Sequence, residues 1–583
     1  MRDYKKIISF ICYFVLLSFF VLYIRLFQIQ LLKGNEYLKL SESNRLRVIN
    51  TPAPRGIIFD RNGIPLVKNS PFLCASVIPG EFDMNKITSL ARLLKIETKE
   101  IYRRLSGKDI SMFSPVKLKE GLSLEEVSYI EARRSDFPGL IIEAEVGREY
   151  LYGDIGAHLI GYLGKPTIEQ LKNDLNISPD IFIGQWGVEK VYDNLLRGIP
   201  GKRIIEVNAL GREIRLLEES LPVKGRDIFL SIDIDVQKKI EEMLVDKMGA
   251  VVAMKPDTGE ILSLVSRPSF DPNLFTKGLT YKSWLNIIND KRRPLLNRAI
   301  QSQYPPGSTF KIVTAIAGLE EGAINPNIKV ECKGGINYGK WRFGCWQKNG
   351  HGILSLHRAI VESCDVYFYE VGKRLGIDKI HDYALRLGLG EKTGIELPGE
   401  RAGLIPNTKW KMEKRKSPWY LGETFNSAIG QGYVAVTPLQ MAVLMSAVSN
   451  GGYLYKPTII KSEKPTILKK IDLKTETIDC IRRGLYGVVN EGGGTGWAAR
   501  SDIVKIAGKT GTAQVISKKD ASTYYSGSFK DHAWFVAFAP VENPEMAISV
   551  IVEHGGHGGG AAAPIAKRAI ETYFTKKKQE RNE

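Results

Sequence analysis

"QYPPGSTFKIVTAIAGLEEG", residues 303–322, joins a Pro-Pro-Gly turn to a helix of apolar periodicity that ends near Gly322. Ser308 opens that helix and Lys311 follows three positions later, so the two side chains share one helix face. An amine one turn away can take the proton of a serine hydroxyl, and the helix N-terminus can stabilise a developing oxyanion. The same pattern also fits a capping serine followed by a surface lysine. The pair therefore indicates a catalytic site only together with other residues.

Two further segments carry residues of the same chemistry. Ser363 and Asp365 stand on either side of Cys364 at the head of a predicted helix, "VYFYEVGKRLG". "GKTGTAQ", residues 508–514, is typical of a strand whose glycines leave room for an extended peptide to hydrogen-bond beside it. Lys509 on that strand would point into the cleft as a fixed cation. The alternative for an isolated Lys-Thr-Gly is an ordinary turn.

Together and in this order, the three segments resemble the Ser-x-x-Lys, Ser-x-Asn and Lys-Thr-Gly motifs of the penicillin-binding proteins and serine β-lactamases. "RGIIFDRNG" (55–63) and "GVEKVYDNLLRG" (187–198) look like the non-catalytic domain of class B penicillin-binding proteins. The length leaves no room for the glycosyltransferase domain of class A members. On this resemblance the chain is identified as a member of class B.

The resemblance and the order of predicted elements imply an α+β multidomain fold. We expect a cytoplasmic tail (1–6), a transmembrane helix (7–24), an elongated α+β non-catalytic pedestal or dimerisation domain (25–222), a transpeptidase domain (223–572) and a basic tail (573–583). In the transpeptidase domain, an amphipathic helix and a strand-turn-strand segment around Asp257 predict an antiparallel sheet flanked by helices.

The resemblance also implies a role for each site residue. Ser308 would be the acyl-enzyme nucleophile and Lys311 its general base, while Ser363 would relay a proton to the leaving amine. Ser308 would attack the penultimate D-alanine carbonyl of a stem peptide, and the amine of a second stem peptide would resolve the acyl-enzyme. β-Lactams would acylate the same serine. The substrate carboxylate and peptide would be held by Lys509, Thr510, Gly511 and Thr512, with N–H groups of Ser308 and Thr512 as the oxyanion hole.

Asp365 departs from the motif, because the wider family has asparagine at this position. An amide can donate a hydrogen bond to a substrate carbonyl, whereas an ionised carboxylate only accepts. Either Asp365 pairs with a lysine of the site, or it has a role specific to a subgroup. With an aspartate at this position, the chain resembles the elongation-type group, penicillin-binding protein 2, rather than division-specific transpeptidases.

Three of the six cysteines cluster in sequence with one histidine: Cys332, Cys345, His351 and Cys364. This Cys₃His set is the tetrahedral donor set that structural zinc prefers, although its spacing is wider than in a zinc finger. The alternative is a Cys332–Cys345 disulfide, which would leave Cys364 as a free thiol beside the nucleophile. The resemblance favours zinc, because some members of the penicillin-binding protein 2 group carry a metal in this segment. Three other histidines fit less well: His357 in a predicted helix, and His554 and His557 in a glycine-rich loop.

Residues 7–24 form an uncharged apolar run of the length that crosses a bilayer. Arg2, Lys5 and Lys6 precede this run, and positive residues tend to stay in the cytoplasm, so the rest of the chain would lie in the periplasm. The run is long for a signal peptide and lacks small residues after it, which favours an uncleaved inner-membrane anchor. The net charge of +18 comes without a nucleic-acid-binding motif, so it fits anionic lipid and cell wall better than nucleic acid.

The sequence therefore predicts a peptidoglycan D,D-transpeptidase that acts in cell elongation and shape maintenance and needs no cofactor for catalysis. The implied partners are peptidoglycan stem peptides, a SEDS-type glycosyltransferase and scaffold proteins of the elongation machinery. Alternatives in the same superfamily are a division-specific transpeptidase, or a D,D-carboxypeptidase or β-lactamase with water as acceptor. The non-enzymatic alternative is a β-lactam sensor, which would need several membrane helices and a cytoplasmic effector domain.

Overall fold

The computed structural model describes residues 2–35, 37, 45–106, 112, 115–174, 177, 181–208, 213–276, 279, 281–461, 464–514 and 530–582. These residues form two compact units, each assembled from several stretches of chain. Unit 1 consists of Met1–Gly56, Asn69–Gly147 and Arg197–Arg226, and unit 2 of Ile57–Lys68, Arg148–Leu196 and Asp227–Glu583. The predicted domain boundaries stay predictions.

Helix α1 (Arg2–Phe27) covers the whole predicted transmembrane run, 7–24, and continues into the π-helical turn η1 (Gln28–Leu32). Its apolar side chains are exposed along its length. Among the described residues, this is the helix long and apolar enough to cross a membrane, by length and composition. A helix satisfies its backbone N–H and C=O groups internally, which is what a lipid environment requires.

Unit 1 contains an antiparallel sheet in the order β1-β8-β9, formed by β1 (Leu46–Thr51), β8 (Gly201–Val207) and β9 (Glu213–Ser220). A separate small core lies under helices α3 (Ile87–Leu94), α4 (Thr98–Leu105) and α5 (Leu124–Glu131) and strand β4 (Val116–Leu122). The C-terminal half of β3 (Pro65–Val77) pairs with β4. Helix α5 begins with a capping box between Ser123 and Glu126, which satisfies two orphan N–H groups.

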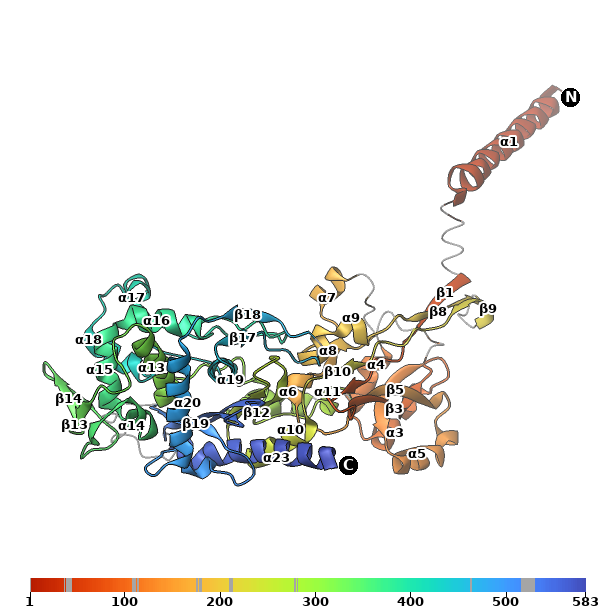
Figure 1. Ribbon diagram of the computed structural model, residues 1–583. Helices are drawn as coiled ribbons and strands as arrows, with labels where there is room; N and C mark the ends of the chain where they lie inside the picture. The colour runs from red at the N-terminus through yellow and green to blue at the C-terminus, as the bar shows by residue number, and fades with distance from the viewer. Residues whose placement is uncertain are drawn as a thin grey trace. The chain divides into compact units, whose positions relative to one another are not determined.

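The centre of unit 2 is an antiparallel sheet in the order β12-β11-β21-β20-β19 (Figure 1). Its strands are β11 (Gly249–Met254), β12 (Ile261–Arg267), β19 (Ala507–Ala513), β20 (His532–Ala539) and β21 (Met546–Val552). Alternate residues of β11 enter different cores: Val252 and Met254 enter one, Val251 and Ala253 the other. Because both faces are buried, these strands have continuous apolar sequences. The predicted antiparallel sheet flanked by helices is confirmed.

Helices cover both faces of this sheet. Helix α10 (Ile234–Met243) and the C-terminal helix α23 (Ala563–Asn582) pack side by side on one face (Figure 1). Helix α19 (Pro438–Ser449) packs on the other and is buried all round, as its uniformly apolar sequence requires. The first helix after Asp227 and the last helix of the unit therefore meet on a single face.

The remaining core of unit 2 is helical. Its main helices are α13 (Lys311–Glu320), α15 (Asp365–Leu375), α18 (Leu421–Ala428) and α20 (Thr475–Asn490). Two short hairpins follow α13 in the chain: β13 (Val330–Cys332) pairs with β16 (Gly352–Leu354), and β14 (Gly335–Tyr338) with β15 (Trp341–Gly344).

The remaining elements of the two units are mostly short. They are β2 (Ile58–Phe59), η2 (Met84–Lys86), η3 (Arg134–Asp136), β5 (Leu140–Tyr150), α6 (Ala157–Ile160), β6 (Leu163–Gly164), α7 (Ile168–Asn173), β7 (Ile183–Gly184), α8 (Gly187–Val191), α9 (Asp193–Leu196), β10 (Ile228–Phe229), α11 (Asn273–Thr276), α12 (Tyr281–Asn289), η4 (Gly307–Phe310), α14 (Leu356–Val361), α16 (Ile377–Arg386), α17 (Thr408–Arg415), β17 (Tyr453–Tyr455), β18 (Ile467–Lys470), η5 (Trp497–Ala499) and α22 (Gly558–Ala561).

Candidate active site and metal centre

Ser308 lies in the 3₁₀ turn η4, which leads directly into α13 at Lys311. The sequence predicted that the helix begins at Ser308; the first turn is instead the tighter 3₁₀ form, as is common at helix N-termini. Gly307 precedes the serine with φ of +56°, and its N–H donates to the Gly430 carbonyl at 2.9 Å. A Cβ at Gly307 would lie 2.4 Å from the Thr512 carbonyl oxygen. The turn η4, here called the serine turn, therefore packs directly against the Lys-Thr-Gly strand β19.

Lys311 is buried, with 1% of its surface exposed. Its Nζ donates to the Ser363 carbonyl at 2.8 Å, to Ser363 Oγ at 3.3 Å and to Asp365 Oδ1 at 2.7 Å. Within the described part of the chain, the hydrogen bonds of Lys311 Nζ go to these two residues rather than to Ser308. Of the two alternatives raised for Asp365, the structure has the pairing with a lysine of the site.

Ser363 is the point at which all three motifs meet. Its Oγ accepts hydrogen bonds from Lys509 Nζ at 2.8 Å and from Lys311 Nζ at 3.3 Å. Its backbone has φ of +56°, a left-handed conformation that residues other than glycine rarely adopt. Such strain persists only where surrounding contacts over-determine the geometry. Here two lysines hold the residue.

Lys509 is fully buried on β19 and lies between Ser363 and its own strand, where it also donates to the Thr510 carbonyl at 3.2 Å. Burial lowers its pKa well below the ordinary lysine value, and the nearby charge of Lys311 lowers it further, partly offset by Asp365. A neutral amine is therefore more accessible to Lys509 than to an ordinary exposed lysine.

Three residues of the site were not found from the sequence. Gln431 donates from Nε2 to the Thr512 carbonyl at 3.0 Å, and Thr495 Oγ1 lies 2.7 Å from Thr510 Oγ1. Trp346 donates from its backbone N–H to Asp365 Oδ2 at 2.9 Å. A Gly-Gln-Gly run at 430–432 was the available signal for Gln431. The other two have no local motif.

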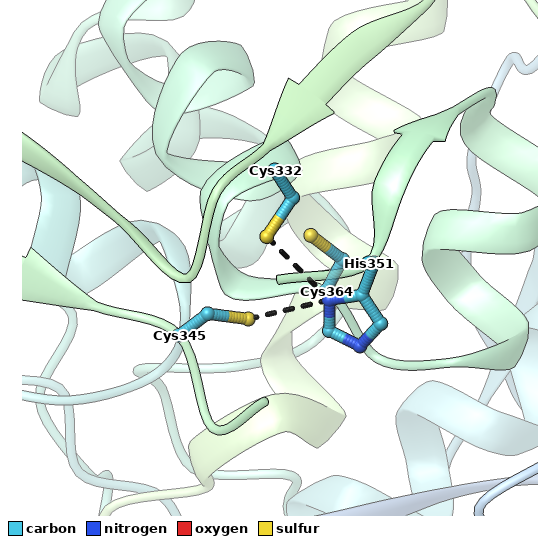
Figure 2. A group of neighbouring side chains, drawn as sticks. All are labelled: Cys332, Cys345, His351 and Cys364. Atoms are coloured by element: carbon cyan, nitrogen blue, oxygen red, sulfur yellow. Dashed lines mark hydrogen bonds between the residues drawn. The ribbon is translucent and has the colours of Figure 1, made fainter. Parts of the chain in front are cut away.

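The predicted metal residues do come together. The donor atoms of Cys332, Cys345, His351 and Cys364 all lie within 4.8 Å of one another, and all three cysteines are buried (Figure 2). His351 Nδ1 lies 3.5 Å from Cys332 Sγ and 3.5 Å from Cys345 Sγ (Figure 2). Hairpin β13–β16, the end of β15 and the start of α15 thus contribute to one cluster.

The cysteines of this cluster are unbonded to one another, so the structure does not contain the alternative Cys332–Cys345 disulfide. A hydrogen bond from Cys364 lowers the pKa of the Cys345 thiol, and the Asp365 N–H donates to the same sulfur at 3.4 Å. The same bond raises the pKa of the Cys364 thiol, so it favours the metal-ligating thiolate form at Cys345 alone. Of the histidines set aside, His357 pairs with Glu491 at 3.0 Å, and His554 Nδ1 lies 3.0 Å from the Lys530 carbonyl.

Comparison with known proteins places this geometry in a family. Residues 249–571 match the penicillin binding protein transpeptidase domain, and residues 50–230 match the penicillin-binding protein dimerisation domain. Peptidoglycan D,D-transpeptidase MrdA of Acinetobacter baumannii is 36% identical over 602 aligned positions, covering 99% of this chain and 89% of the relative.

Two solved structures are similar over almost the same length. The complex between penicillin-binding protein PBP2 and MreC from Helicobacter pylori contains a chain that is 30% identical, with a TM-score of 0.79 and coverage of 91% and 99%. The second structure is described as "Structural coordination of polymerization and crosslinking by a peptidoglycan synthase complex". Its similar chain is 31% identical, with a TM-score of 0.73, and the match covers 97% of this chain and 98% of that chain. With the serine, lysine and Lys-Thr-Gly motifs around one buried site, this chain belongs to the class B penicillin-binding proteins, in the penicillin-binding protein 2 (MrdA) group.

Proposed function

We propose that Ser308 is the acyl-enzyme nucleophile of an elongation-type peptidoglycan D,D-transpeptidase. Family membership supports the activity, since relatives named MrdA carry it in their names. The observation that carries the residue assignment is the hydrogen-bonded series Lys311, Ser363, Lys509 beside the serine turn. One hydroxyl between two lysines offers a route along which a proton can move to and from the reacting atoms.

The route suggests how Lys311 becomes a base. Burial lowers the pKa of Lys509, so in the resting site it is neutral more readily than an ordinary exposed lysine. A substrate carboxylate bound beside Lys509 stabilises its charged form and draws a proton across the Ser363 hydroxyl from Lys311. Lys311 is then neutral and accepts the proton of Ser308. Substrate binding and activation of the nucleophile are coupled in this way.

The remaining steps follow from the same residues. Ser308 Oγ attacks the D-alanine carbonyl, and N–H groups of Ser308 and Thr512 stabilise the oxyanion. The departing D-alanine amine takes its proton through Ser363. Gln431 and the seating of Gly307 against Thr512 keep the two oxyanion donors at a fixed separation. β-Lactams, as mimics of the substrate, acylate the same oxygen.

Labelling by fluorescent penicillin tests this assignment. Ser308→Ala in the full chain should abolish covalent labelling, because the attacking oxygen is gone. Ser128→Ala, the same change on the exposed surface of α5, should label like the unmodified chain. Persistent labelling of Ser308→Ala would overturn the mechanism.

We also propose that the cluster of Cys332, Cys345, His351 and Cys364 holds a structural zinc ion. In a tetrahedral site with Zn–S of about 2.3 Å and Zn–N of about 2.0 Å, sulfur and nitrogen lie about 3.5 Å apart. The two sulfur-to-nitrogen distances here, both 3.5 Å, fit that geometry. A bound ion would link the hairpin segment to the start of α15, next to Ser363.

Metal content measured on the purified chain tests this proposal. We expect about one zinc per chain, because the four donors together complete one tetrahedral site. Cys345→Ser should lose it, and Cys480→Ser, at a buried cysteine outside the cluster, should keep it. A chain without zinc and with a mapped Cys332–Cys345 disulfide would refute the zinc site.

The membrane and the partners complete the proposal. We propose that α1 is a single-pass inner-membrane anchor and that the enzymatic unit faces the periplasm. The similar structures support assembly with other proteins: one is a complex with MreC, and another is a peptidoglycan synthase complex. A SEDS-type glycosyltransferase and an elongation scaffold are the partners that we propose. Co-purification of both with the full chain, and loss of the glycosyltransferase when α1 is replaced by an unrelated transmembrane helix, is the expected result.

A further inference from the structure

Trp346 combines an exposed ring with two N–H groups that both donate hydrogen bonds. The residue is 55% exposed. Its backbone N–H donates to Asp365 Oδ2 at 2.9 Å, and its indole Nε1 donates to the Ser363 carbonyl at 3.1 Å and the Glu362 carbonyl at 3.0 Å. His351 packs edge-on against the ring at 5.4 Å between centroids. The ring is thus held in one place while a large part of its apolar surface faces solvent.

The same residue shares the anchors of the proposed general base. Lys311 Nζ is held by the Ser363 carbonyl and by Asp365 Oδ1. Trp346 binds that same carbonyl oxygen and the other oxygen of that same carboxylate. The exposed indole therefore stands at the Ser363 side of the reacting centre, at a position fixed relative to the proton route.

We infer that the exposed face of Trp346 binds the acceptor amine and its aliphatic stem in the second half of the reaction. This inference rests on the proposed function. By microscopic reversibility, the amine that leaves during acylation and the amine that attacks the acyl-enzyme exchange their protons with the same group, which is Ser363. The leaving amine and the attacking amine must both pass the surface beside Ser363. Trp346 is an exposed aromatic residue that is hydrogen-bonded to the Ser363 carbonyl.

The chemistry of the acceptor suits an aromatic wall. A primary amine on an aliphatic side chain arrives as an ammonium, which is attracted to the face of an indole, and its methylene groups pack on the same surface. After the ammonium loses one proton to solvent, the neutral nitrogen forms its bond to the acyl carbon. The bond from Ser308 Oγ to that carbon breaks, and the second proton of the nitrogen returns to Ser308 Oγ through Ser363 and Lys311.

The experiment separates the two half-reactions in the full chain. Acylation is measured with fluorescent penicillin, which needs no acceptor, and transfer is measured as cross-link formation with a stem-peptide donor and an amine acceptor of varied concentration. Trp346→Ala should raise the KM for the acceptor about tenfold, which corresponds to ~1.4 kcal/mol. Its acylation rate should stay within about twofold of the unmodified chain, because Lys311 retains its own hydrogen bonds.

Two variants make the result specific. Trp346→Phe keeps an aromatic face and loses the indole N–H, so its acceptor KM should stay close to the original. Trp341→Ala removes a more exposed tryptophan five residues away and should change neither half-reaction. An unchanged acceptor KM in Trp346→Ala refutes the inference, as does a parallel fall of acylation and transfer. Failure of the proposed function appears separately, as labelling that survives Ser308→Ala.

Discussion

Replacing Asp365 with asparagine, the residue of the wider family, is the most direct test of the buried pair in the active site. The Asp365 carboxylate lies 2.7 Å from Lys311 Nζ, with side-chain exposures of 12% and 1%. At an effective dielectric constant of about 20, two unit charges at that distance attract by about 6 kcal/mol. An amide oxygen keeps a hydrogen bond to the ammonium worth about 1.5–3 kcal/mol. The difference, about 3 kcal/mol, agrees with the cost of breaking a buried ion pair.

Asp365→Asn should therefore lower the free energy of unfolding of unit 2 by about 3 kcal/mol at neutral pH. It should also slow acylation by fluorescent penicillin, because a neutral amide holds Lys311 in position more weakly than the carboxylate does. Unfolding is followed in urea on the full chain in detergent, with the acylation rate measured on the same samples. The slope of the transition is compared between variants, so that a change in cooperativity is not read as a change in stability.

Asp290→Asn is the matched control. Asp290 also pairs with a cation, Arg292 at 2.8 Å, but that arginine is largely exposed. Water and salt screen such a pair, so the substitution should leave the urea midpoint nearly unchanged. If Asp365→Asn shares the midpoint of the unmodified chain, the Lys311–Asp365 pair contributes no net stability and the reasoning from burial fails.

Three further substitutions or conditions test other parts of unit 2. Burial lowers the pKa of His158 to about 4, although its Nε2 bonds the Pro294 carbonyl at 2.7 Å. The unfolded chain therefore binds the extra proton at a higher pH than the folded chain, and stability should fall as the pH drops from about 6.5 toward 4. His158→Gln should remove this pH dependence, which thermal midpoints at several pH values measure. Gly307→Ala should slow acylation strongly, since its Cβ meets a backbone oxygen, whereas Gly322→Ala, with similar φ and open space, should not. Gln431→Ala removes the side-chain donor to the Thr512 carbonyl and should slow acylation about tenfold, the effect of one lost hydrogen bond. Normal labelling kinetics in this variant would exclude a role of Gln431 in positioning the Lys-Thr-Gly strand.

The sequence predicted the features that depend on local spacing. Ser308 and Lys311 lie three residues apart, and Lys509 stands on a strand between two glycines, so the motifs were visible without any contact information. The antiparallel sheet and its helices were predicted for the same reason. The four metal-binding candidates lie within 33 residues, and the structure gathers all four.

Contacts between distant segments could not be predicted. Gln431 meets the strand near Thr512 because the loop after α18 folds against the serine turn, and no periodicity encodes that approach. The left-handed backbone of Ser363 is likewise imposed from outside, by two lysines 52 and 146 residues away. No local motif indicated Trp346, since its three hydrogen bonds go to atoms of another segment.

The strand order of the central sheet has a consequence for biogenesis. Strand β11 ends at Met254, but its neighbour β21 begins at Met546, so nearly three hundred residues separate the partners. During synthesis from the N-terminus, β11 and β12 would form an apolar hairpin with an open edge until the last part of the chain arrives. Unpaired apolar edges invite association with other chains. We expect chaperones to shield this hairpin until β21 has been synthesised.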